Sequence, residues 1–255
     1  MINVIFDGGD FTKIKGMFPA ESFTDGVTVD WLGHTWTAKT GEIYGSQVGA
    51  SASNQYWLTK SKYSNGYYIL TNEDAVIKNK RFIFVAEQVL SGTGTNDGAE
   101  WGGYKNTNGS GATGEVVGTS KSNTDILISA KLSPQSTNHA IAVQWVRRSG
   151  RYIGSNNPTC PTTFDGVEDT GNCDLPCPQT AYTIWQLRDS LPQIKNASGA
   201  SANNFWPRGG TSYNVWTSRY WHSTHAFNAS NNGNCGGTAP KMLLLGVIAV
   251  KEIGY

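Results

Sequence analysis

The sequence predicts a mainly β protein, an antiparallel β-sandwich or barrel-like sheet with long loops rich in Gly, Asn and Trp and one short helix. Three observations support this fold class. Short runs of β-branched and aromatic residues are separated by turn residues along most of the chain. Helical periodicity is confined to one segment. The 255 residues include 30 Gly and only 15% charged residues, so turns are frequent and the surface is polar but weakly charged.

The first predicted strands lie in the N-terminal half of the chain. Residues 25–31 alternate apolar and polar side chains, and a second strand over 34–39 follows a turn at Leu32-Gly33. The segment 56–71, YWLTKSKYSNGYYILT, places Asn65-Gly66 between two aromatic and β-branched runs, which predicts a β-hairpin with a type I′ turn at this pair. Three further strands are predicted over residues 81–90, 124–132 and 139–148.

The C-terminal part contains the predicted helix and the most apolar strand. In TAYTIWQLRDSLPQI, residues 180–194, the apolar residues recur at helical spacing, which predicts two to three turns capped by Thr180 and ended by Pro192. The run KMLLLGVIAVKEI, residues 241–253, is nearly all apolar. We therefore expect it to be a central strand buried on both faces.

The chain divides into two parts by composition. Residues 1–151 form a β body that includes a long loop over 91–114, and residues 152–255 form a loop-rich distal part that contains all four cysteines. The distal part is expected to return to the sheet through the strand over 241–253.

Charge and composition exclude several functions. A net charge of +1 leaves no basic stripe for binding nucleic acid. No apolar run approaches 18 residues, so no membrane span is expected, and the N-terminus lacks the basic and apolar regions of a signal peptide. There is no G-x-S-x-G elbow, P-loop or dinucleotide fingerprint, and no catalytic residue is predicted. Four carboxylates are available for glycoside hydrolysis, although nothing distinguishes them: Asp30, Glu42, Glu87 and Glu100.

The four cysteines predict two disulfide bonds. Their spacing does not match the paired C-x-x-C pattern of zinc sites, and prolines adjoin the thiols, as in a crosslinked loop. Three pairings are possible, and we favour those that join Cys173 and Cys177 to distant partners. Four reduced, buried thiols are the alternative. The cysteines are Cys160, Cys173, Cys177 and Cys235.

Two segments contain candidate metal ligands. His222 and His225 have the residue types for a zinc or iron site, with Cys235 as a further ligand. Residues three apart in an extended strand face opposite sides, so we favour surface or packed histidines instead. The acidic segment over 164–174 offers oxygen ligands for calcium, but its spacing is not that of an EF-hand, and a solvated turn is the preferred interpretation. No cofactor is therefore predicted.

Aromatic residues next to Asn, Gly, Ser and Thr in predicted loops indicate carbohydrate recognition. A flat ring packs against the C–H face of a sugar, while amides and hydroxyls bond its hydroxyl groups. Tryptophans within the predicted strands are expected to fill the core instead. The candidate ligand-binding residues are Trp101, Tyr104, Trp206, Tyr213, Trp216 and Trp221.

From the signal-free Met1 through the Gly/Asn/Thr-rich strands to HSTHAFN, the chain resembles bacteriophage virion proteins of the tail-fibre, receptor-binding or capsid-decoration type. The resemblance implies a non-enzymatic structural protein that acts outside the cell after host lysis. It also implies a homo-oligomer, most often a trimer, that binds a cell-surface glycan or a neighbouring virion subunit. Two other classes stay open: a secreted lectin or adhesin, and a polysaccharide-degrading enzyme.

Overall fold

The computed structural model describes about two thirds of the chain. The described residues are 25–31, 34–43, 52–59, 66–71, 82–90, 98–105, 107–149, 157–161, 163–164, 167–168, 171–191, 195–196 and 214–253.

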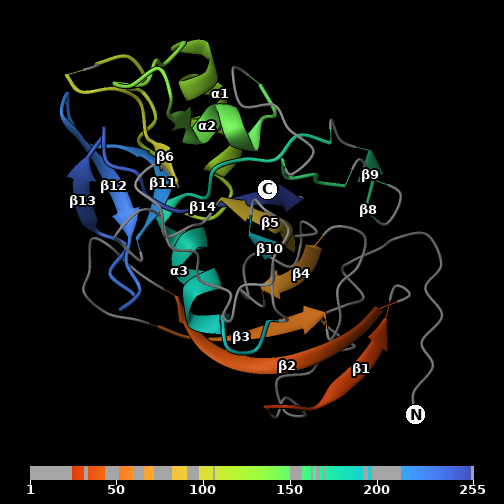
Figure 1. Cartoon of the computed structure of the whole chain (residues 1–255). Helices are drawn as coiled ribbons and strands as arrows, with labels where there is room; N and C mark the ends of the chain where they lie inside the picture. The colour runs from red at the N-terminus through yellow and green to blue at the C-terminus, as the bar shows by residue number, and fades with distance from the viewer. Residues whose placement is uncertain are drawn as a thin grey trace.

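A large, mainly antiparallel sheet forms the body of the protein (Figure 1). Its first five strands follow one another in chain order, and β14 pairs antiparallel with the free edge of β5. The short β10 pairs parallel with the last residues of β5, beyond the end of β4. The described strands form an open sheet and do not close into a barrel. The strands are β1 (Thr28–Trp31), β2 (His34–Ile43), β3 (Ala52–Thr59), β4 (Gly66–Thr71), β5 (Phe82–Leu90), β10 (Lys195–Asn196) and β14 (Val247–Ile253).

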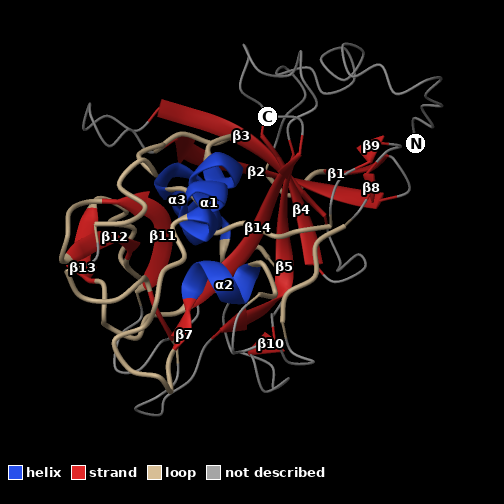
Figure 2. Ribbon diagram, turned by 90° about the horizontal axis from the view of Figure 1, so that it is seen from above, coloured by secondary structure: helices blue, strands red, loops and turns tan. Residues whose placement is uncertain are grey.

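The smaller elements surround this sheet. A three-stranded antiparallel sheet contains β11 (Val215–Tyr220), β12 (His225–Ala229) and β13 (Gly237–Pro240). Two short pairs are β6 (Ala99–Glu100) with β7 (Ala140–Ile141), and β8 (Thr163–Phe164) with β9 (Val167–Glu168). The described helices are α1 (Ser120–Ser129), α2 (Ala142–Val146) and α3 (Pro178–Leu187). In Figure 1, α1 and α2 lie on one side of β14 and β5 and α3 lies on the other, and Figure 2 shows β11, β12 and β13 to the left of the helices. None of them has the length and apolar character needed to cross a membrane.

The large sheet is buried on both faces because successive residues of its central strands are apolar. Phe82 and Phe84 of β5 point to the face where the core includes residues of α1 and α2. Ile83 and Val85 point to the opposite face, where α3 packs. The mainly β fold class is confirmed, and the C-terminal strand is buried on both faces as expected. It is not central, because among the described strands β14 pairs only with β5 and ends the sheet on that side. That strand begins at Val247, whereas residues 241–246 form a turn and a loop.

The predicted pairing of the N-terminal strands is confirmed, but one turn is not where the sequence placed it. Trp31 pairs with His34, so β1 and β2 are adjacent antiparallel strands, as expected. In the β3–β4 hairpin, Leu58 pairs with Ile69, so the register excludes a two-residue turn at Asn65-Gly66. Gly66 instead belongs to β4, where an added Cβ would lie 2.1 Å from the Val85 carbonyl oxygen. Glycine is needed here for close approach of two strands.

The strand predicted over residues 124–132 is wrong, because most of this segment lies in α1. The buried residues of α1 are Ser120, Asn123, Thr124 and Leu127, which share one face of a helix. Three of these four side chains are polar, so apolar periodicity does not reveal the buried face. Their hydrogen bonds to other segments supply the reason for burial.

The segment 139–148 was also predicted as one strand. Only Ala140–Ile141 pairs with β6, and the chain then turns into α2. The helix predicted over 180–194 is confirmed as α3, although it begins at Pro178 and ends at Leu187. Proline suits the first position of a helix because its missing N–H has no helical partner there. Thr180 therefore lies in the first turn rather than at the cap.

Candidate functional site

Two of the predicted ligand-binding residues are core residues, which corrects that part of the prediction. Trp101 is 1% exposed and Trp216 is fully buried. Their indole N–H groups donate to the carbonyl oxygens of Thr217 (2.9 Å) and Ala99 (2.6 Å), respectively. The two rings therefore brace β6 against β11 and offer no face to a ligand.

The other predicted aromatic residues divide into exposed and undescribed ones. Trp221 is 52% exposed and Tyr104 is 45% exposed. Trp206 and Tyr213 lie outside the described residues. Trp221 follows directly after β11.

Trp221 stands at a tight turn between β11 and β12. The backbone N–H of His222 donates to the carbonyl of His225 (3.1 Å), which closes the turn. The Trp221 ring meets Phe227 edge to face, with centroids 5.2 Å apart and planes at 86°. Arg219 lies on Phe227, 4.0 Å from its centroid, and forms an ion pair with Glu115. The exposed indole is thus supported from the side by a packed ring.

The same turn brings His222 and His225 together. Their ring centroids are 5.0 Å apart, and both Nδ1 atoms lie near the Thr224 hydroxyl. The sequence argument that the two rings diverge assumed an extended backbone, and that assumption is wrong because the chain turns here. Across the described part of the chain, no group of three or more His, Cys, Asp or Glu side chains is arranged to hold a metal ion.

A buried lysine underlies the turn. The backbone N–H of Lys241 donates to the Thr224 carbonyl (2.9 Å), and its side chain is fully buried. The ammonium lies 4.1 Å from the Tyr220 centroid and 4.8 Å from that of Trp101. Burial lowers the pKa of Lys241 to about 8. The sequence analysis missed this residue, since a lysine at the start of an apolar run looks like the polar end of a strand.

We refer to Trp221, His222, Thr224 and His225 as the turn face. Its polar and aromatic groups are accessible, because Trp221 and His222 are exposed and the other two are half-buried. Met242 and Leu243, which follow Lys241, are exposed as well. The turn face can therefore offer a ring surface and imidazole nitrogens to a ligand.

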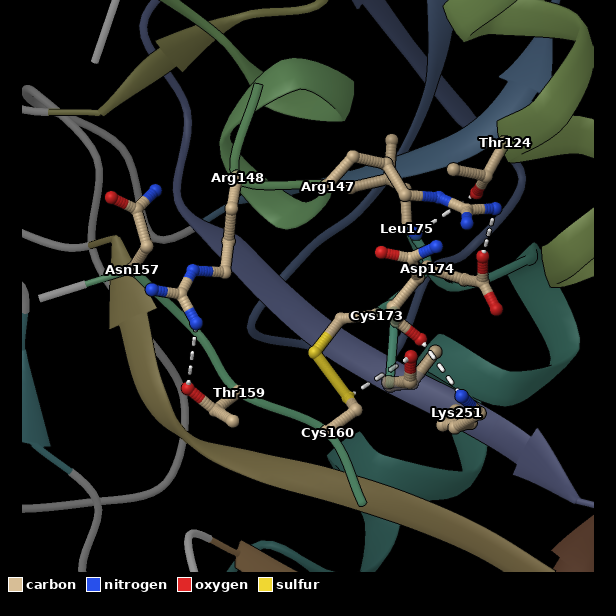
Figure 3. Close-up of a disulfide and its surroundings, with 12 residues drawn as sticks. Thr124, Arg147, Arg148, Asn157, Thr159, Cys160, Cys173, Asp174, Leu175 and Lys251 are labelled. Atoms are coloured by element: carbon tan, nitrogen blue, oxygen red, sulfur yellow. Dashed lines mark hydrogen bonds and ion pairs between the residues drawn. A yellow bond between two sulfur atoms is a disulfide. The ribbon is translucent and has the colours of Figure 1, made fainter. Parts of the chain in front are cut away.

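One of the two predicted disulfides is formed. Cys160 and Cys173 are bonded, which ties the segment before β8 to the segment before α3 (Figure 3). Cys177 and Cys235 are free thiols in the core, so the prediction of a second disulfide bond is wrong. Burial raises the pKa of Cys177 to about 12, and it raises that of Cys235 as well. Such thiols are inert packing groups.

A buried charge cluster lies beside the disulfide. Arg147, which directly follows α2, forms ion pairs with Asp174 and with Asp125 of α1, and Figure 3 shows its guanidinium directed at Asp174. Asp174 also pairs through its backbone with Val250 of β14. Burial raises the pKa of Asp174 to about 7 despite the opposing effect of Arg147. Asp174, the last residue of the acidic segment that was expected to be a solvated turn, is therefore buried and paired with a guanidinium.

The described candidate carboxylates are committed to structural hydrogen bonds or lie in the core. Glu100 is fully buried and accepts from the backbone N–H groups of Gln135 (2.6 Å) and Ser136 (3.2 Å) and from Nδ1 of His139 (2.6 Å). Glu87 is also buried. The side chains of Asp30 and Glu42 lie outside the described residues.

Another carboxylate that the sequence did not single out joins the C-terminal strand to both longer helices. Glu252 accepts from the backbone N–H groups of Gly118 (2.8 Å) and Ser120 (3.0 Å) at the start of α1. It also accepts from the hydroxyls of Ser120 and Thr180. Burial raises the pKa of Glu252, while these hydrogen bonds oppose the rise.

Comparison with protein-family models, curated proteins and solved structures finds no match to this chain. The geometry of the turn face is therefore the main indication of function.

Proposed function

We propose that this chain is a non-enzymatic recognition protein that binds a saccharide through the turn face. The observation that supports this function is the exposed indole of Trp221, which is held edge-on against Phe227 and adjoins two imidazoles. An apolar ring beside fixed hydrogen-bonding groups suits a sugar, whose faces are apolar and whose rim is polar. A supported ring also loses little conformational freedom on binding.

The biological setting that we propose is a bacteriophage virion, with the chain as a tail-fibre, receptor-binding or decoration subunit. Its ligand there is a cell-surface glycan or a neighbouring subunit, and a trimer is the expected assembly. Support comes from the uncharged, Gly/Asn/Thr-rich composition. A secreted lectin or adhesin would use the same turn face, so the saccharide proposal does not depend on the setting.

The first experiment measures saccharide binding by the full chain and by Trp221→Ala. A glycan array identifies ligands, and titration with the best of them gives the affinity. Loss of one stacked ring should weaken binding by about tenfold or more, because such a contact contributes roughly 1 to 3 kcal/mol. Val116→Ala is the matched control, since Val116 is 57% exposed and lies outside the turn face. Equal binding by wild type and Trp221→Ala would exclude the proposed site.

The oligomeric state is tested separately by solution mass. A trimer supports the virion setting, whereas a monomer that still binds saccharide favours the secreted lectin. Met242 and Leu243 supply a second arm of this test, since both are exposed apolar residues. If they lie in a subunit contact, changing both to Ser should dissociate the oligomer.

A further inference from the structure

We propose that His222 and His225 act as a matched pair, one ring donating and the other accepting, that binds two neighbouring hydroxyl groups of a neutral sugar. This inference rests on the proposed function and names the ligand class of the turn face. It follows from three contacts made by Thr224.

The tautomer of His222 follows from the backbone. The N–H of Thr224 donates to Nδ1 of His222 at 3.2 Å. A ring nitrogen that accepts a hydrogen bond carries no proton, so in the neutral imidazole the proton lies on Nε2. Nε2 of His222 is therefore a hydrogen-bond donor.

The Thr224 hydroxyl transmits this assignment to the second ring. Its oxygen lies 3.1 Å from Nδ1 of His222 and 2.8 Å from Nδ1 of His225. For both contacts to be hydrogen bonds, the single hydroxyl proton has to point to Nδ1 of His222, which only accepts, and the hydroxyl oxygen has to accept from Nδ1 of His225. The proton of His225 is then on Nδ1. Nε2 of His225 carries a lone pair and is a hydrogen-bond acceptor.

The two Nε2 atoms are available for a ligand. Within the described residues, neither Nε2 has a hydrogen-bond partner, and the ring centroids are 5.0 Å apart. His222 is exposed and His225 is half-buried. The turn face thus presents a donor and an acceptor together.

Neighbouring sugar hydroxyls match this arrangement. Each hydroxyl both donates and accepts, so one can accept from His222 while its neighbour donates to His225. Trp221 lies on the adjoining side of the pair, with its centroid 6.2 Å from that of the His222 ring. A sugar ring stacked on the indole would direct its hydroxyl rim toward the imidazoles. A simple cation or anion would use only one half of the pair.

A divalent transition metal is the competing occupant, because two imidazole nitrogens are also metal ligands. Zinc would require His222 to change tautomer, which would break the hydrogen bond from the Thr224 backbone. Binding measured with and without chelator separates the two occupants.

The test uses the full chain in EDTA with three probes: methyl α-mannoside, methyl β-galactoside and methyl β-glucoside. Ligand-observed NMR identifies the best probe, and titration gives its Kd. Thr224→Val removes the hydroxyl that couples the rings, and His225→Phe removes the acceptor. Each should raise Kd by about fivefold to tenfold, the loss expected for one hydrogen bond. His225→Gln places an amide near the position of Nε2 and should keep Kd within about threefold of wild type.

The outcomes separate this inference from the proposed function. If wild type binds none of the three neutral probes but binds a glycan on the array, the proposed function stands and the histidine pair is overturned; if it binds neither, both are wrong. If Trp221→Ala loses binding while Thr224→Val and His225→Phe retain it, the saccharide site stands and the histidine pair is overturned. Binding that is lost in EDTA and restored by Zn²⁺ would also overturn the pair, since the rings would then serve a metal. Thermal unfolding of each variant confirms that the fold is intact.

Discussion

The large sheet and the layer around α1 are held together by different chemistry. In β4, β5 and β14, successive apolar side chains fill the cores on both faces of the sheet. In α1, the buried side chains are mainly hydroxyls and an amide that bond to distant segments: Asn123 to Gly114 and Ser218, Thr124 to Leu175, and Ser120 to Cys177. The sheet is therefore recognisable from hydrophobic pattern, whereas the α1 layer depends on partners far away in the chain.

The largest expected effect comes from truncating a ring in the sheet. Phe84→Ala removes a fully buried side chain from β5 and should lower the free energy of unfolding by about 3 to 5 kcal/mol. Chemical denaturation monitored by tryptophan fluorescence measures this change. A loss below about 1 kcal/mol would mean that the sheet core is not packed as described.

The next effect concerns the polar face of α1. Asn123→Ala leaves the backbone groups of Gly114 without their side-chain partner, and it should cost about 1 to 3 kcal/mol. Ile126→Ala is the matched control on the same helix, because Ile126 is exposed, and should change stability by less than about 0.5 kcal/mol. A larger loss of stability in Ile126→Ala than in Asn123→Ala would contradict the polar character of the buried face of α1.

A pH effect is expected from the buried charge cluster. The pKa of Asp174 is raised from 3.8 to about 7 in the folded chain, so the folded state binds more protons than the unfolded state between these values. The contribution of Asp174 to stability is thus fully present below pH 4 and is lost as the pH rises through about 7. Asp174→Asn should flatten this dependence, as measured by denaturation between pH 4 and 8. An unchanged slope would show that Asp174 titrates normally.

The smallest effect is expected at the lysine under the turn face. The lowered pKa of Lys241, about 8 against 10.5, means that the unfolded state binds more protons between these values. The contribution of Lys241 therefore increases stability as the pH rises from about 8 to 10.5. Lys241→Met keeps the buried chain without its charge and should remove this increase. Denaturation at pH 7.5 and 10 gives the difference, and a wild-type rise that survives in the variant would assign it to other groups.

Particular residues show how far the candidate site was predictable. Trp221 was recognised because an aromatic residue among Ser, Thr and Asn in a loop is typical of a binding surface. Trp101 has a similar sequence neighbourhood, in GAEWGG, yet it is buried against β11. The sequence cannot distinguish the two, because burial of Trp101 depends on Thr217, more than a hundred residues later.

The sequence by itself determined the mainly β architecture, the longer strands of the large sheet and α3. Those elements are encoded locally, through alternation, turn residues and the helical spacing of apolar side chains. Tertiary structure decided the helical state of α1, the register of β3 against β4 and the convergence of His222 and His225. Each of these depends on hydrogen bonds or backbone contacts formed only in the folded chain, which local pattern does not record.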